Sequence, residues 1–332
     1  MPIDTLDQLF DSFKNKKVLV LGDVMLDTYI YGSVNRISPE APVPVVNVQR
    51  REKRLGGAAN VALNIQALGA EPILCSIVGD DEEGAAFSER LGARGITEKG
   101  IIRSSKRITT VKNRIISGSQ QLIRIDSEMD EPLEGIDKKT LLQHISKLID
   151  ECDLIIFEDY DKGCLDEEVI TKVIEQANAS GKLTAVDPKK RNFLSYKNCT
   201  LFKPNLKELK EGLGISVDPT SLDSLKKGVD ELNKTLGAEN ELITLSQHGV
   251  YYQNAETNGT HPAHLRSISD VSGAGDTVIS IAALAMNAGM PLKFVAELAN
   301  LGGGIVCESP GVVPIDLTRL KEEAGKNERL VL

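Results

Sequence analysis

The chain has 332 residues, of which 41% are hydrophobic and 26% are charged, a composition typical of a soluble globular protein with a sizeable core. Its formal net charge of -9 argues against nucleic acid and anionic membranes as partners, because both need a basic binding surface. No signal peptide is visible at the N-terminus, and no apolar run approaches the roughly 20 residues of a membrane span. The five cysteines are scattered without a C-x-x-C pair, so we expect free thiols and a cytoplasmic protein.

The chain opens with a short surface helix over residues 5–14 and a buried strand over 18–21. Asp23 and Asp27 follow that strand at its carboxyl end, where open α/β sheets bind their ligands. The alternative is that both acids only form a turn. The next segments predict strands at 28–31 and 43–48, with a polar loop at 35–42 between them, and we interpret the basic run at 49–54 as a solvated turn.

A helix begins near Leu55-Gly56-Gly57-Ala58-Ala59-Asn60 and ends at Gly69. The two glycines would allow a ligand to approach the backbone closely, and Asn60 could bind sugar hydroxyls. Glycines at this place could equally serve close contact between the helix and a sheet.

From Ile73 onward, strands and helices alternate, which indicates a mainly parallel sheet with helices on both faces. The expected strands are 73–78, 154–157, 183–186, 199–203, 242–245 and 250–253. The expected helices are 82–93, 138–151, 166–179, 205–212, 221–236, 276–288, 292–307 and 316–325.

Residues 107–126 interrupt this alternation with a hairpin that turns at Ser117-Gly118-Ser119. Together with the strands within 28–50, the hairpin would form a small second sheet, so we expect a single domain over 1–332 with a β-sheet lid. Lys112 and Arg114 share one strand face, which suits a phosphate, although a solvated edge strand would also carry such cations. Lys162, directly after a strand of the main sheet, is a third candidate.

The segment Gly273-Ala274-Gly275-Asp276 precedes an apolar run that reads as a buried helix. The free N–H groups and positive dipole end at the start of such a helix bind anions. A carboxylate beside an anion makes sense if Asp276 takes a proton from a hydroxyl that attacks phosphorus. The alternative is a tight loop with an N-capping aspartate.

Two further strand ends carry polar residues that suit a nucleotide. Asn205 and Glu208 have the spacing of a capping box, and the same spacing would let them hold waters around Mg²⁺. The turn from Ser246 to Gly249 could line an adenosine. The chain lacks the P-loop motif, and it lacks G-x-G-x-x-G after the first strand, which counts against P-loop kinases and dinucleotide dehydrogenases.

Taken in order, the Gly56-Gly57 segment, Asn205-x-x-Glu208 and Gly273-Ala274-Gly275-Asp276 resemble the ribokinase-like (PfkB) carbohydrate kinases over nearly the whole chain. The resemblance implies a three-layer α/β sandwich with a β-sheet lid, ATP and Mg²⁺ as cofactors, and a possible monovalent cation site. Because the lid strands are expected to be exposed, we also expect a homodimer through them. It implies a base at Asp276 and an anion hole at Gly273, Ala274 and Gly275. The implied ATP-binding residues are Asn205, Leu206, Lys207 and Glu208, with Glu208 reaching Mg²⁺ through water. Ser246, Gly249 and Asn300 are further candidates for binding ATP. The implied substrate-binding residues are Asp23, Asp27, Gly56, Gly57 and Asn60. Lys112, Arg114 and Lys162 join them as substrate-binding candidates on account of their charge and position.

Within that family, the segments 22–27, 36–45 and 120–126 are similar to kinases of D-glycero-β-D-manno-heptose 7-phosphate. This similarity implies phosphorylation of the anomeric C1 hydroxyl to the 1,7-bisphosphate, in ADP-heptose biosynthesis. The chain length predicts the kinase half alone, without the adenylyltransferase half of fused versions. The alternatives are a PfkB kinase of another phosphosugar, such as fructose 6-phosphate or tagatose phosphate, and a non-catalytic sugar-binding regulator. Asp270-Val271-Ser272 departs mildly from the family pattern. The segment 308–312 also departs from it, which leaves the adenine pocket and any monovalent cation site open.

Overall fold

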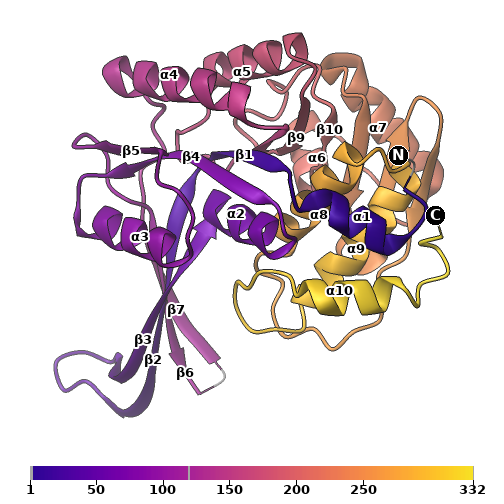
Figure 1. Cartoon of the computed structure of the whole chain (residues 1–332). Helices are drawn as coiled ribbons and strands as arrows, with labels where there is room; N and C mark the ends of the chain where they lie inside the picture. The colour runs from indigo at the N-terminus through magenta and orange to yellow at the C-terminus, as the bar shows by residue number, and fades with distance from the viewer. Residues whose placement is uncertain (1–2, 119, 332) are drawn as a thin grey trace.

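Two β-sheets organise the chain in the computed structural model, which describes residues 3–118 and 120–331 (Figure 1). The described part of the large sheet has nine strands in the order β13-β12-β11-β10-β9-β8-β1-β4-β5. Neighbours from β11 to β5 are parallel, whereas β12 and β13 are antiparallel. The strands are β1 (Lys17–Gly22), β4 (Glu71–Gly79), β5 (Gly100–Ser104), β8 (Leu154–Glu158), β9 (Leu183–Asp187), β10 (Leu201–Phe202), β11 (Asn240–Thr244), β12 (Val250–Asn254) and β13 (Asn258–His261).

Helices cover both faces of this sheet and bury one apolar cluster on each side (Figure 1). One face carries α4 (Gly135–Glu151), α5 (Glu167–Ala179), α6 (Leu206–Leu213) and α7 (Leu222–Leu236). The other carries α1 (Leu6–Phe13), α2 (Ala58–Ala67), α3 (Glu82–Ala93), α8 (Ala274–Asn287), α9 (Leu292–Val306) and α10 (Leu317–Ala324). The expected three-layer α/β sandwich is confirmed. Among the described helices, none is both long enough and apolar enough to cross a membrane.

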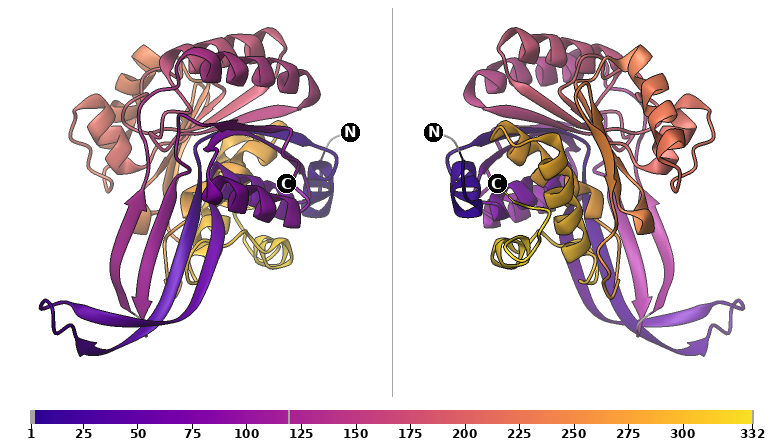
Figure 2. Two further views of the ribbon diagram at one scale, coloured as in Figure 1. Left: turned by 90° about the vertical axis from the view of Figure 1, so that its left-hand side faces the viewer. Right: turned by 90° about the vertical axis from the view of Figure 1, so that its right-hand side faces the viewer.

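A smaller sheet projects from this body as a long ribbon, which we call the lid (Figure 2). Its strands are β2 (Val24–Ile37), β3 (Pro44–Gly57), β6 (Val111–Ser117) and β7 (Gln120–Ser127). Their order is β3-β2-β6-β7, with β2 and β6 parallel and the other pairs antiparallel. The lid therefore combines the two segments that the sequence assigned to it. Ser119, in the expected turn of the hairpin, lies outside the described residues.

The first lid hairpin is much longer than the sequence predicted. Asp27 lies inside β2, the basic run at 49–54 lies inside β3, and residues 55–57 end that strand instead of opening α2. The basic run was therefore wrongly interpreted as a turn. Two of its arginines lie over tyrosine rings of β2, with Arg50 at 4.2 Å from the Tyr31 centroid and Arg54 at 4.8 Å from the Tyr29 centroid. Such cation–π contacts stabilise a polar ribbon that hydrophobic alternation does not reveal.

Elsewhere the expected elements are present, with ends shifted by a few residues. Two strands at the edges of the large sheet, β5 and β13, were not predicted. Both are short, with five and four residues, and β13 is polar, so neither shows the apolar run of a buried strand.

Candidate active site

The N-terminus of α8 lies among the carboxyl ends of the central strands. Gly273 caps the helix in a left-handed conformation, with φ of 81°, which favours glycine. The N–H of Ala274 donates to the carbonyl of Val271 at 3.3 Å. No acceptor for the N–H groups of Gly275 and Asp276 is found among the described residues, so both remain able to bind an anion.

Asp276, in the first turn of α8, is held by two side chains from distant segments. Asn60 on α2 donates its Nδ2 to Oδ2 of Asp276 at 2.6 Å, and the Tyr160 hydroxyl donates to Oδ1 at 3.0 Å. The residue is only 4% exposed, and burial raises the pKa of its carboxyl while the hydrogen bonds from Asn60 and Tyr160 oppose that rise. The arrangement orients a carboxylate beside an anion-binding helix end, which suits a general base.

Two more acids end neighbouring strands close to Asp276. Glu158 ends β8 and Asp187 ends β9, and the two residues are paired in the sheet register. One carboxylate oxygen from each of Glu158, Asp187 and Asp276 lies within 4.8 Å of the others. Burial, and then the charges of Asp187 and Asp276, raise the pKa of Glu158 well above its usual value.

Two lysines accompany these acids, of which Lys203 is buried and Lys189 is half-buried. Lys203 Nζ lies 2.8 Å from Oδ2 of Asp187, and Lys189 Nζ lies 2.7 Å from Oε1 of Glu208. Burial alone would lower the pKa of Lys203, but Asp187 and Glu208 raise it above its usual value. A Cβ placed on Gly275 would lie 3.4 Å from Oδ2 of Asp187 and 3.7 Å from Lys203 Nζ, so this ion pair adjoins the start of α8.

Asn205 and Glu208 form the expected capping box at the start of α6. Asn205 Oδ1 accepts from the N–H of Glu208 at 2.9 Å, and Oε2 of Glu208 accepts from the N–H of Asn205 at 2.8 Å. Because Oε1 of Glu208 binds Lys189, each carboxylate oxygen already has a partner. Lys207 points to solvent, with its side chain 80% exposed, and Leu206 is half-buried beside the cap.

The remaining residues expected to bind ATP lie in the turn between β11 and β12 and on α9. Ser246 begins a 3-10 turn with φ of 53°, and Gly249 ends it with φ of 87°. A Cβ on Gly249 would lie 2.0 Å from the carbonyl oxygen of His261, so this position requires glycine for structural reasons. Asn300 on α9 donates to the carbonyl of Pro262 at 2.9 Å.

Asp23 and Asp27 both have structural partners. Asp23 accepts the N–H groups of Tyr160, Lys162 and Cys164 at 2.9–3.0 Å, which fixes the loop after β8. Burial raises the pKa of Asp23 to about 6. Asp27 forms an ion pair with Arg114 of β6.

The glycine pair at the end of β3 lies against these acids. A Cβ on Gly56 would lie 2.2 Å from Oδ2 of Asp27, and one on Gly57 would lie 2.4 Å from the carbonyl of Asp23. Gly57 also has a left-handed φ of 61°. Both glycines therefore permit close packing at the point where the lid joins the body.

The three candidate phosphate-binding cations differ in how they are paired. Arg114 is bound to Asp27, and Lys162 Nζ lies 2.9 Å from Oε1 of Glu128. No salt bridge to Lys112 is found among the described residues; its Nζ lies 5.9 Å from the centre of the Tyr160 ring. Lys112 and Arg114 do share one face of β6, as expected.

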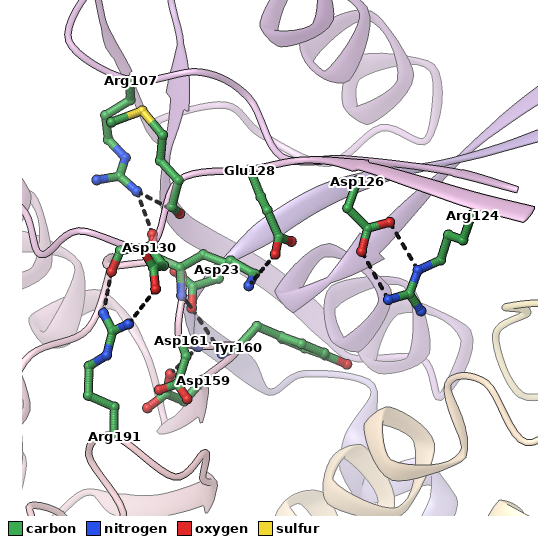
Figure 3. A network of polar contacts seen from close by, with 12 residues as sticks. Asp23, Arg107, Arg124, Asp126, Glu128, Asp130, Asp159, Tyr160, Asp161 and Arg191 are labelled. Atoms are coloured by element: carbon green, nitrogen blue, oxygen red, sulfur yellow. Dashed lines mark hydrogen bonds and ion pairs between the residues drawn. The ribbon is translucent and has the colours of Figure 1, made fainter.

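The loop that carries Tyr160 is fixed by a network of ion pairs and hydrogen bonds at the base of the lid (Figure 3). Arg107 donates to the carbonyl oxygens of Glu131 and Lys162, and Arg191 pairs with Asp130 at 2.7 Å. These contacts tie the end of the lid to the site.

Sequence reasoning gave no role to several residues that the fold brings to this site: Glu158, Tyr160, Asp187, Lys189 and Lys203. Glu158 and Asp187 each directly follow an expected strand, so the position of both at carboxyl strand ends was an available signal. The contact between Tyr160 and Asp276 spans 116 residues and leaves no local pattern.

Comparison with known proteins agrees with this geometry. Residues 15–318 match the pfkB family carbohydrate kinase profile. The chain belongs to this family. It is therefore a phosphotransferase that acts on a sugar hydroxyl.

Curated relatives include the Bifunctional protein HldE of Helicobacter pylori, which is 41% identical over 296 residues, covering 89% of this chain and 64% of the relative. HldE of Caulobacter vibrioides is 43% identical, covering 93% of this chain and 63% of the relative. The chain thus spans somewhat under two thirds of the length of these proteins.

Solved structures show the same fold at low identity. The phosphofructokinase-2 of Escherichia coli in complex with potassium has a TM-score of 0.76 at 18% identity, covering 93% of this chain and 97% of the other. The ribokinase of Arabidopsis thaliana, complexed with ribose and ATP, has a TM-score of 0.71 at 16% identity, covering 93% and 99%. The ribokinase-like fold is thereby confirmed.

Proposed function

We propose that this kinase transfers the γ-phosphoryl group of ATP to the C1 hydroxyl of D-glycero-β-D-manno-heptose 7-phosphate, giving ADP and the 1,7-bisphosphate in ADP-heptose biosynthesis. The observation that carries the chemistry is the Asp276 carboxylate, held by Asn60 and Tyr160 beside the open N–H groups of α8. The substrate rests on the heptose-kinase-like segments of the sequence and on relatives that are about 40% identical.

In this proposal, Asp276 accepts the proton of the C1 hydroxyl while the hydroxyl oxygen attacks the γ-phosphorus and ADP leaves. The N–H groups at the start of α8 stabilise the charge that develops on the phosphoryl oxygens, because they are already oriented toward the anion. Mg²⁺ would supply further charge stabilisation on the phosphates. The buried carboxylates around Asp187, together with Glu208 through water, fit an oxygen-binding ion of this kind.

A panel of sugar phosphates tests the substrate, with ADP release as the readout. We expect the heptose 7-phosphate to give the highest kcat/KM and the product to show an anomeric phosphate by ³¹P NMR. A higher kcat/KM with fructose 6-phosphate or tagatose 6-phosphate would reassign the substrate. No ADP release with any sugar, with ATP still bound, would favour a regulator.

We also propose that two copies associate through the outer face of the lid. Side chains alternate across a strand, so the face opposite Lys112 and Arg114 carries Ile115, Ile123 and Ile125. Ile123 and Ile125 are 55% and 52% exposed, and a second lid would cover them. Light scattering should report a dimer for the native chain and a monomer for the double variant Ile123→Lys, Ile125→Lys; a native monomer would contradict the proposal.

A further inference from the structure

A hollow lies at the base of the lid, outside the candidate active site. Figure 1 shows α3 beside the base of the lid, where it contacts β3. The hollow between them has a volume of about 330 Å³ and is bordered by β3, α2, α3 and the segment 312–314. Pockets that bind small molecules have volumes of about 300–1,000 Å³, so a small ligand fits this one.

The lining of this hollow is basic, although the chain carries a net charge of -9. The charged residues of the lining are Glu52, Lys53, Arg54, Arg90 and Arg94. Glu52 pairs with Arg54, and Glu83 pairs with Lys53, both at 2.6 Å. Arg90 donates to the backbone carbonyls of Lys53 and Ala86, and no salt bridge to Arg90 or Arg94 is found among the described residues. The four cations of the lining and the two acids bonded to them leave a net charge of +2.

The chemistry of the lining favours a phosphorylated ligand. The planar guanidinium of arginine binds phosphate and carboxylate groups through two parallel hydrogen bonds. A phosphate monoester carries about −1.5 to −2 charges near neutral pH, which offsets the lining, whereas a single carboxylate would offset only half of it. Leu63, Val313 and Pro314 also line the hollow, and this apolar part suits the carbon skeleton of an organic phosphate.

Arg54 connects the hollow to the candidate active site. Its Nη1 donates to the carbonyl oxygens of Pro310 and Val312, at 3.3 and 3.1 Å. Val312 lies against the start of α8, because a Cβ on Gly273 would be 3.3 Å from its Cγ1. A phosphate in the hollow attracts the same guanidinium, which weakens its hold on the segment beside the anion-binding end of α8.

We propose that this hollow is a second binding site, for a small organic phosphate, and that its occupation weakens nucleotide binding through Arg54. The binding site is independent of the proposed kinase function, whereas the effect on the nucleotide rests on it.

Calorimetric titration with phenyl phosphate tests the site on the full chain, saturated with Mg²⁺ and a non-hydrolysable ATP analogue. We expect binding that weakens about tenfold or more in Arg94→Gln, because a charge-assisted contact to the phosphate is lost. Arg94 is exposed at the end of α3, so the fold should tolerate this change. Arg36→Gln is the matched control, because it removes an exposed arginine that does not line the hollow, and its affinity for phenyl phosphate should equal that of the native chain. Equal affinity in the native chain and Arg94→Gln would overturn the proposal.

Lys112→Met separates this site from the proposed sugar site. The variant should bind phenyl phosphate as tightly as the native chain does, since Lys112 does not line the hollow. Loss of binding in Lys112→Met would place the phosphate under the lid and contradict a second site. Because no heptose is present, a failure of the heptose assay leaves these outcomes unaffected.

The affinity for the ATP analogue, measured with and without phenyl phosphate, tests the effect on the nucleotide. Coupling between two sites is typically about 5–150-fold, so phenyl phosphate should raise the Kd of the analogue about fivefold or more in the native chain. The rise should be smaller in Arg94→Gln, whereas direct competition at the nucleotide site would affect both proteins alike. An equal rise in both proteins, or none in the native chain, would exclude transmission through Arg54.

Discussion

The Tyr160 hydroxyl lies 3.0 Å from Oδ1 of Asp276, while Asn60 Nδ2 lies 2.6 Å from Oδ2 of the same carboxylate. Tyr160 comes from the loop after β8 and Asn60 from α2, so the orientation of the proposed base depends on two segments that are far from it in the sequence. Because a carboxylate accepts several hydrogen bonds, the sugar hydroxyl can bind Asp276 without displacing either donor.

Replacing Tyr160 with Phe should therefore lower kcat, because the proposed base loses one of the two side chains that orient it. A hydrogen bond to a charged group contributes about 1.5–3 kcal/mol, so we expect kcat to fall by about tenfold or more, with little change in the KM for ATP. The matched control is Tyr196→Phe, which removes a buried hydroxyl that donates to Asp159 at 2.7 Å and does not touch Asp276. If the two variants lose activity equally, Tyr160 supports the fold and does not act through Asp276.

Replacing Asp276 with Asn should abolish turnover while ATP binding survives, because the open N–H groups of α8 belong to the backbone. Positioned proton transfer is worth on the order of 10²–10⁴ in rate, and kcat should fall by that factor. Steady-state kinetics and calorimetric ATP titration measure the two effects separately. A variant that retains more than about a tenth of the native kcat would exclude Asp276 as the base.

The sequence was sufficient to predict those features of the site that lie within one short motif. The glycines before α8, the capping box of Asn205 and Glu208, and most elements of the large sheet follow from residue spacing alone. The lid ribbon could not be predicted from such spacing. Backbone pairing and cation–π contacts stabilise β2 and β3, and neither produces an alternation of apolar and polar residues in the sequence. The partners of Asp276 could not be predicted because they depend on how distant segments pack.

Lys112 should bind the 7-phosphate of the substrate. No salt bridge to Lys112 is found among the described residues, whereas Arg114 and Lys162 are bound to acids. A charge-assisted contact to phosphate contributes roughly 1.5–3 kcal/mol, so Lys112→Met should raise the KM for the phosphorylated heptose by about 10- to 150-fold. The KM for ATP should change little, and the KM for the unphosphorylated heptose should be nearly unchanged. Equal losses for both sugars would mean that Lys112 shapes the lid without contacting the phosphate.

Asn64 on α2 should control both stability and turnover, because it links three segments around the base. Its Oδ1 accepts from the Thr277 hydroxyl and from the N–H of Ile315, both at 3.0 Å, and its Nδ2 donates to the carbonyl of Asn60 at 2.9 Å. Asn64→Leu leaves buried groups unpaired and should lower the free energy of unfolding by about 1–3 kcal/mol. We expect kcat to fall as well, measured at a temperature where circular dichroism shows a folded chain; a native kcat there would mean that Asn64 only stabilises the fold.

Glu241 on β11 should make the protein less stable as pH rises. Burial, and then the charge of Asp230, raise the pKa of Glu241 from 4.5 to about 8, and neither carboxylate oxygen has a partner among the described residues. Between these two pH values the unfolded chain releases this proton and the folded chain keeps it. The unfolded state then binds fewer protons, so the contribution of Glu241 to the free energy of unfolding falls by up to about 1.4 kcal/mol per pH unit. Glu241→Gln cannot titrate, and its urea-unfolding free energy should exceed that of the native chain at pH 8 by more than it does at pH 5. Parallel pH profiles for the two proteins would show that Glu241 titrates alike in the folded and unfolded states.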